Sequence, residues 1–195
     1  MPKYAYTIEN KTAIKNIVSE GRGNTSLKIW EHDVLKKTRA DIKTHIINER
    51  ENGKKCAYCL KSFNNEHNMN IDIEHILPKS KYPKYTFTLK NLAVACKRCN
   101  LQIKRDDTSF LTTSFNPRKP FKSEFYKLTH PVIDKKNKLQ LREIRFQNIH
   151  IVKYTYDNEK AKYTYDYFKL ENVEIEQLDH AQGIIPLIDY LSTLK

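Results

Sequence analysis

The sequence predicts an α+β fold: helices first, then a short central region of strand, loop and helix, then a mixed C-terminal region. Three observations predict it. Apolar residues recur at helical spacing before residue 50, two short apolar runs follow, and Cys-x-x-Cys pairs at residues 56–59 and 96–99 enclose those runs. The 195 residues contain 39% apolar residues, enough for an ordinary core. We therefore divide the chain into residues 1–52, 53–110 and 111–195.

The N-terminal region reads as two helices, over residues 11–20 and 27–50, separated by the glycine-rich residues 21–24. The apolar residues of the second helix fall roughly on one face, and Trp30 among them is expected in the core. This face consists of Ile29, Trp30, Val34, Leu35, Ile42 and Ile46.

The central region reads as strand, loop and helix. An apolar run over residues 71–77 ends at Pro78, and a second run ends at the second cysteine pair. In the C-terminal region, residues 139–146 alternate as a strand would. The pentapeptide Lys-Tyr-Thr-Tyr-Asp begins at residues 153 and 162, which fits either a hairpin or a helix over 159–170. Residues 173–194 have near-helical apolar spacing and an acidic tail spans 171–195.

The composition indicates a polyanionic partner. The net charge is +12, and the basic excess lies in residues 1–170, since residues 171–195 hold one lysine against five acidic residues. Lysine and arginine near phosphates release counterions and attract nucleic acid. A solvated surface is the alternative reading. No apolar run could cross a bilayer and no secretory signal is visible, which predicts a cytoplasmic protein with no membrane partner.

The two cysteine pairs predict a structural zinc site. In a reducing compartment four cysteines are better read as metal thiolates than as disulfides. Cys56 and Cys59 lie on one tight turn and Cys96 and Cys99 on another. Four thiolates close the tetrahedral shell of Zn²⁺, leaving no open position for catalysis. Redox activity of each pair alone is the alternative, and the doublet favours structure.

Between the cysteine pairs lies Glu74-His75, four and three residues before Pro78. Alternation along a strand puts the two side chains on opposite faces unless the strand bends. By itself the pair could be a surface carboxylate beside a hydrogen-bonded histidine. The order Glu-His-x-x-Pro, then Asn91-Leu92, then Cys-x-x-Cys-Asn-x-x-x-Lys ending at Lys104 is more specific. Over this quarter of the chain, the sequence resembles the HNH endonuclease family.

The resemblance implies a ββα-metal fold with a catalytic role for four residues. His75 would be the general base and Asn91 would steady the hairpin and the histidine. Glu74 and Asn100 would ligate the catalytic metal. Many family members have Asp in place of Glu74 and His in place of Asn100. Carboxylate, amide and water oxygens suit Mg²⁺, with Mn²⁺ as the alternative.

These assignments predict metal-assisted phosphodiester hydrolysis. His75, with an ordinary pKa near 6.5, can take a proton from water at neutral pH. One cation stabilises the charge that develops on the phosphate. The resemblance implies products with 5′-phosphate and 3′-hydroxyl ends. Lys104 and Lys79 are candidate phosphate contacts, and surface solubility is the alternative reading of both.

The expected substrate is DNA, with RNA left open. Two other function classes compete: a non-catalytic zinc module that binds nucleic acid, and an effector subunit controlled by a regulatory protein partner or by homodimerisation. The first would not need Glu74, His75, Asn91 and Asn100 in this order. The arrangement of this chain, with a helical region before the motif, resembles that of HNH components of bacterial anti-phage defence and restriction systems. The analogy concerns the arrangement of regions alone.

Overall fold

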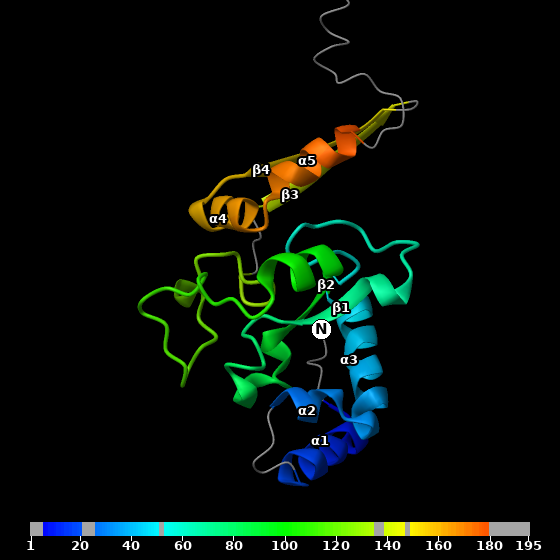
Figure 1. The fold of residues 1–195 in the computed structure, drawn as a ribbon, viewed down its shortest axis with the longest axis vertical. Coiled ribbons are helices and arrows are strands. Elements are labelled where there is room, and N and C mark those ends of the chain that lie inside the picture. Colours follow the sequence, from blue (N-terminus) through cyan, green and yellow to red (C-terminus); the bar gives the residue numbers. More distant parts are fainter. Residues whose placement is uncertain (1–5, 21–25, 51–52, 135–138, 147–148, 180–195) are drawn as a thin grey trace, which may run out of the picture. The chain divides into compact units, whose positions relative to one another are not determined.

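The computed structural model describes residues 6–20, 26–50, 53–134, 139–146 and 149–179. The chain forms two compact units, residues 1–57 with 62–108, and residues 58–61 with 109–195. The first unit joins the N-terminal helices to the segment between the cysteine pairs. The helices predicted for the N-terminal region and the mixed α+β class are confirmed (Figure 1). The packing of residues 111–195 on the core stays a prediction.

Three helices precede the hairpin in the first unit: α1 (Ile8–Glu20), α2 (Ser26–Glu31) and α3 (Lys36–Glu49). A single turn of 3₁₀ helix, Asp33–Leu35, separates α2 from α3 where one helix was predicted. His32 begins this turn, because its Nδ1 accepts a hydrogen bond from the Val34 amide at 3.3 Å. The break changes the helical register.

The change of register decides which apolar residues reach the core. Leu35, Ile42 and Ile46 are at most 1% exposed, and Trp30 is buried as predicted. Val34, which the sequence places on the same face, is instead 59% exposed. A continuous helix would have kept it near Trp30 on the helix surface, and the 3₁₀ turn removes that relation.

The hairpin consists of β1 (Ile71–His75) and β2 (Leu92–Cys96), paired antiparallel with His75 opposite Leu92. The strand β1 ends two residues earlier than predicted. The Ile76 amide donates to the Asn91 main-chain oxygen at 2.9 Å, and the Leu77 amide donates to Asn91 Oδ1 at 2.7 Å. These bonds bend the chain out of the strand.

A helical segment, Arg98–Lys104, follows β2 and places Cys99 in the core, whereas Cys96 ends β2 and is half-buried. It is a π-helix, and its wide turn continues to the Arg105 amide, which donates to the Asn100 carbonyl at 2.9 Å. The predicted ββα order is therefore present in a variant whose helix is wider than an α-helix.

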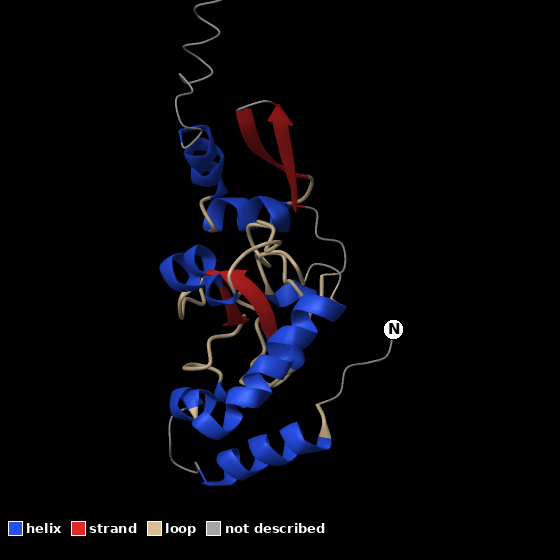
Figure 2. Cartoon of the chain, turned by 90° about the vertical axis from the view of Figure 1, so that its right-hand side faces the viewer, coloured by secondary structure: helices blue, strands red, loops and turns tan. Residues whose placement is uncertain are grey.

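The second unit contains a hairpin of β3 (Leu139–Phe146) and β4 (Ile149–Tyr156), then α4 (Glu159–Tyr167) and α5 (Leu170–Asp179) (Figure 2). The strand predicted at residues 139–146 is confirmed. Tyr58 stacks on Phe168 with ring centroids 4.2 Å apart. The predicted apolar tail beyond residue 179 lies outside the described residues.

The repeated pentapeptide adopts two different structures. The copy at residues 153–157 lies mostly in β4, whereas the copy at 162–166 lies in α4. Asn158 caps α4, since its Oδ1 accepts from the Ala161 amide at 2.8 Å. Neighbouring capping and strand pairing, rather than the pentapeptide itself, therefore select the structure.

Candidate active site

The four cysteines gather as a metal-binding cluster. Their sulfur atoms all lie within 4.8 Å of one another. A tetrahedral Zn²⁺ with bonds of about 2.3 Å needs sulfurs about 3.8 Å apart, so the cluster fits zinc. Cys56, Cys59 and Cys99 are buried. The Cys96 amide donates to Cys56 Sγ at 3.4 Å, a contact that typically stabilises a thiolate. The donor chemistry is that of a structural zinc site.

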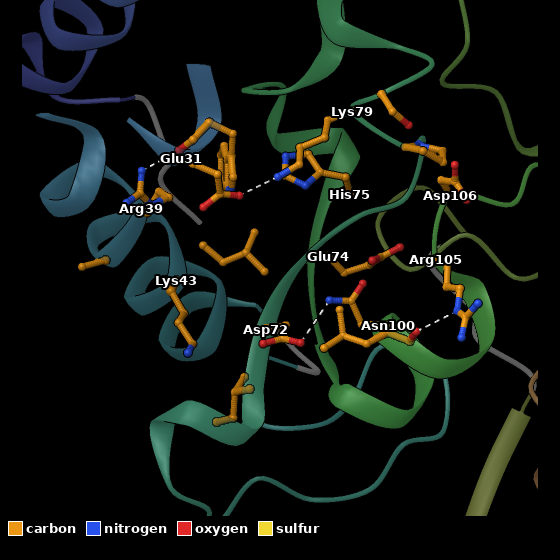
Figure 3. A pocket seen from close by; sticks show the side chains of 17 residues that line it. Glu31, Arg39, Lys43, Asp72, Glu74, His75, Lys79, Asn100, Arg105 and Asp106 are labelled. Atoms are coloured by element: carbon orange, nitrogen blue, oxygen red, sulfur yellow. Dashed lines mark hydrogen bonds and ion pairs between the residues drawn. The ribbon is translucent and has the colours of Figure 1, made fainter. Parts of the chain in front are cut away.

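A cleft of about 520 Å³ opens beside β1. One wall is formed by β1, the loop after it and the π-helix, and the other wall by α2 and α3 (Figure 3). His75, Glu74 and Asn100 all line it, so the structure brings together three residues that the sequence predicts to act together. The other charged lining residues are Glu31, Arg39, Lys43, Asp72, Lys79, Arg105 and Asp106.

His75 is held in one orientation and one protonation state. Its Nε2 lies 3.1 Å from the Thr86 carbonyl oxygen, which can only accept, so Nε2 carries the proton and Nδ1 carries the lone pair. The Trp30 ring meets the imidazole edge-on, with centroids 4.5 Å apart. Burial, and then the charge of Lys79, lower the pKa of His75 to about 3. The imidazole is therefore neutral at physiological pH.

Glu74 forms a buried ion pair. Lys104 Nζ lies 2.7 Å from Glu74 Oε1, and neither side chain is more than 2% exposed. The same amine donates to the His75 carbonyl at 3.0 Å. Lys104 thus does not lie on the surface, where the sequence predicts a phosphate contact, because the π-helix carries its side chain beneath β1. Its position suits an orienting role toward Glu74.

We expect the Glu74–Lys104 pair to matter for stability. Replacing Lys104 by Met leaves a buried carboxylate without its cation, and should lower the free energy of unfolding by about 3–5 kcal/mol. Lys97→Met provides the control, because the Lys97–Asp72 pair is half-exposed and should contribute below about 1 kcal/mol. Urea unfolding of both variants measures the difference. Equal losses of unfolding free energy in the two variants would show that the buried pair stabilises the protein no more than the half-exposed pair does.

Asp72 is a site residue that the sequence reasoning missed. Asn100 Nδ2 donates to Asp72 Oδ2 at 3.1 Å, and Lys97 Nζ lies 3.1 Å from the other carboxylate oxygen. A signal was available, because Asp72 and Glu74 are two residues apart and share one face of β1. Figure 3 shows Asp72, Glu74 and Asn100 at the same end of the cleft.

Asn91 holds the loop between β1 and β2 in place. It is fully buried, and its side chain bonds to three main-chain groups. Its Oδ1 accepts from the Leu77 amide, while its Nδ2 donates to the carbonyls of Leu77 at 3.0 Å and Tyr85 at 3.1 Å. These hydrogen bonds hold the segment that follows His75 in one conformation.

Loss of the Asn91 side-chain hydrogen bonds should destabilise the first unit. Asn91→Ala removes three buried hydrogen bonds, of which two are to the main chain of Leu77 and one is to the Tyr85 carbonyl, which keeps its bond from the Thr88 amide. The substitution should cost about 2–4 kcal/mol of unfolding free energy. The exposed Asn64 offers a matched control, and Asn64→Ala should change stability by less than about 0.5 kcal/mol. Chemical denaturation of both variants tests this. An Asn91→Ala protein as stable as wild type would contradict a stabilising role for the Asn91 side chain.

Lys79 lies at the rim of the cleft. Its amine is 2.7 Å from Glu31 Oε1 and 5.9 Å from the centroid of the Trp30 ring. The side chain is 18% exposed. Its place on the cleft wall fits a substrate contact, but the salt bridge to α2 means that a phosphate would have to compete with Glu31.

Among the helices that the structure describes, none is long and apolar enough to cross a membrane.

Comparison of the sequence with known protein families and proteins gives two matches. The family model described as HNH endonuclease matches residues 56–106, which covers both cysteine pairs, Glu74, His75 and Asn100. The chain is also similar to the Septu protein PtuB of Bacillus thuringiensis, with 41% identity over 46 residues. That match spans 24% of this chain and 18% of the relative.

No solved structure matches the chain. The matched segment ends at Asp106, two residues after the π-helix, so it includes the hairpin, the helix and all four clustered cysteines. Over residues 56–106, about a quarter of the chain, this protein is therefore similar to the HNH endonuclease family.

Proposed function

We propose that the protein is a metal-dependent endonuclease that hydrolyses phosphodiester bonds of DNA with one Mg²⁺. The observation that carries the proposal is the meeting of Glu74, His75 and Asn100 in one cleft. Each comes from a different position in the HNH pattern, and the family consists of phosphodiester hydrolases in general. The net charge of +12 supports a polyanionic substrate.

The donor set at the cleft suits a hard cation. Glu74 and Asn100 offer a carboxylate and an amide oxygen, and the Asp72 carboxylate is adjacent to Asn100. Mg²⁺ typically takes one or two protein carboxylates and keeps several waters. Mn²⁺, with similar preferences, is the alternative. When bound, the cation supplies charge neutralisation at the phosphate.

The residues of the chain supply proton transfer and orientation. With its proton on Nε2, His75 carries a lone pair on Nδ1 that can accept a proton from the attacking water. The Thr86 carbonyl and the Trp30 ring restrict the imidazole to one orientation. Asn91 fixes the chain after His75, and Lys104 fixes the Glu74 carboxylate. Pre-organisation of this kind reduces the reorganisation needed during reaction.

We further propose a role in anti-phage defence or restriction. The support is the partial similarity to the Septu protein PtuB, together with the resemblance of the chain's plan to defence nucleases. Control by a regulatory protein or by homodimerisation belongs to the same proposal. Because one such site cuts one strand, a double-strand break requires two sites or two visits.

Incubation of the purified protein with supercoiled plasmid tests the proposal directly. Nicked or linear DNA should appear with Mg²⁺ and not with EDTA. A matched single-stranded RNA substrate measures whether RNA is also cut. Binding of DNA without cleavage, in Mg²⁺ and in Mn²⁺, at concentrations that favour dimers, would contradict the proposal and favour the non-catalytic zinc module.

A further inference from the structure

Among the described residues, three cations that line the cleft contact main-chain oxygens and no carboxylate: Arg39, Lys43 and Arg105. Arg39 Nη1 donates to two carbonyls, of Trp30 and His32. Lys43 comes from α3 and Arg105 follows the π-helix, and Figure 3 shows them on either side of the Glu74 and Asn100 side chains. Within the described part of the chain, neither forms an ion pair. Lys43 Nζ donates to the Asn68 carbonyl at 2.7 Å, and Arg105 Nε donates to the Leu101 carbonyl at 3.0 Å.

The remaining lysines near the site are all matched to carboxylates. Lys79 pairs with a glutamate of α2, and Lys97 and Lys104 pair with acidic residues of β1. A cation that contacts only a main-chain oxygen keeps its charge available to an incoming anion. Lys43 and Arg105 therefore offer charge that is not held in a salt bridge, on opposite walls of the cleft.

The backbone at Arg105 is strained. Its φ of 50° and ψ of −124° lie in a region that favours glycine. The conformation is held by two hydrogen bonds of 2.9 Å, from the Arg105 amide to the Asn100 carbonyl and from the Asp107 amide to the Lys104 carbonyl. A long cationic side chain at a position better suited to glycine is typical of functional sites, where strain is retained for the sake of the side chain.

Lys43 is also in an unfavourable setting for a charge. Burial is the main cause that lowers its pKa from the usual value, with a smaller contribution from Lys97 and an opposing one from Asp72. An anion bound beside the amine would offset the lost solvation. This observation, like the strain at Arg105, points to a ligand with negative charge.

We propose that Lys43 and Arg105 bind two backbone phosphates of the nucleic-acid strand, one on each side of the phosphate that is cut. The inference rests on the proposed nucleic-acid substrate and extends the substrate site to α3, which lies outside the residues matched by the family. The N-terminal helices are then a wall of the active-site cleft. Phosphate contacts position a strand without reading its sequence, so the two residues contribute affinity rather than base preference.

Binding measured in a His75→Ala background separates this site from catalysis. Fluorescence anisotropy with a labelled duplex, over a series of salt concentrations, gives the affinity and its salt slope. We expect Lys43→Gln and Arg105→Gln each to weaken binding about three- to tenfold. Each should reduce the salt slope by about 0.9, the value for one lost phosphate contact on duplex DNA.

Lys37→Gln is the matched control for charge. Lys37 lies on α3 as Lys43 does, but it is outside the cleft lining and pairs with Glu9 and Asp41. Its loss should leave the salt slope unchanged. If Lys37→Gln lowers affinity and slope as much as Lys43→Gln, general charge explains the effect and the proposed site is wrong.

A second pair of variants distinguishes charge from backbone strain. Arg105→Gly and Arg105→Ala both remove the guanidinium, but only glycine relieves the positive φ. We expect the glycine variant to melt at a higher temperature than the alanine variant, with equal loss of DNA affinity. Affinity restored in Arg105→Gly would overturn the phosphate contact. If the wild-type protein cuts plasmid, but Lys43→Gln and Arg105→Gln leave the salt slope of DNA binding unchanged, the proposed phosphate site is wrong and the nuclease proposal stands.

Discussion

Replacing His75 by alanine is expected to lower the rate of plasmid cleavage about 10²–10⁴-fold, the usual contribution of a general base. The reason is positional. His75 follows Glu74 directly and lines the cleft, and its Nδ1 carries the lone pair. Among the residues that the structure describes, no second histidine lines the cleft. Supercoiled plasmid, sampled over time at saturating Mg²⁺, gives the rates.

His67→Ala is the matched control. His67 is exposed, lies outside the cleft lining, and its Nδ1 accepts a hydrogen bond from the Met69 amide, which is a local structural role. Its variant should cut at the wild-type rate. Cleavage by His75→Ala at more than about a tenth of the wild-type rate would contradict the general-base role.

Loss of fold must be separated from loss of the base. Trp30 is the one tryptophan of the chain, and its ring lies 4.5 Å from the His75 ring. Its fluorescence therefore reports on the packing of this site. His75→Asn keeps more of the side-chain volume than alanine, and it should be as inactive as His75→Ala while retaining the emission of a buried tryptophan. Inactivity accompanied by a solvent-exposed spectrum would indicate misfolding instead.

The second large effect is expected at the zinc cluster. Cys99→Ser should remove bound zinc and unfold the first unit, because Cys99 is fully buried and structural zinc supplies about 10–16 kcal/mol in small zinc-binding peptides. Even a fraction of that value is comparable to the whole stability of a domain. Zinc content by elemental analysis and circular dichroism against temperature measure both effects.

Chelation provides an independent test with a metal control. A strong zinc chelator should unfold the wild-type protein, and Zn²⁺ should restore it. Mg²⁺ should not, because thiolates are soft ligands and Mg²⁺ prefers oxygen. Omission of Mg²⁺ from a zinc-loaded protein, without any chelator, should stop cleavage and leave the melting temperature unchanged. A wild-type protein that stays folded after its zinc is removed would contradict a stabilising role for the cluster.

Local patterns in the sequence were enough to predict the cysteine cluster, part of the hairpin and the order of the site residues. Two Cys-x-x-Cys pairs predict one four-sulfur cluster, since each tight turn presents two thiolates together. The apolar run that ends at Pro78 predicts the first strand of the hairpin, and the resemblance to the family implies the second. The order of Glu74, His75, Asn91 and Asn100 indicates the family. Each cysteine turn depends on neighbours within a few residues, so spacing along the chain predicts it. The meeting of the two turns follows because one structural zinc needs four thiolates.

Only the tertiary structure decided how long-range contacts use those residues. The break after α2 turns Val34 to solvent, and the π-helix moves Lys104 from an expected surface position to a buried pair with Glu74. The environment of His75, between the Trp30 ring and the Thr86 carbonyl, joins segments that are far apart in the sequence. Burial and ion pairing depend on which segments meet in space, and local periodicity carries no information on that.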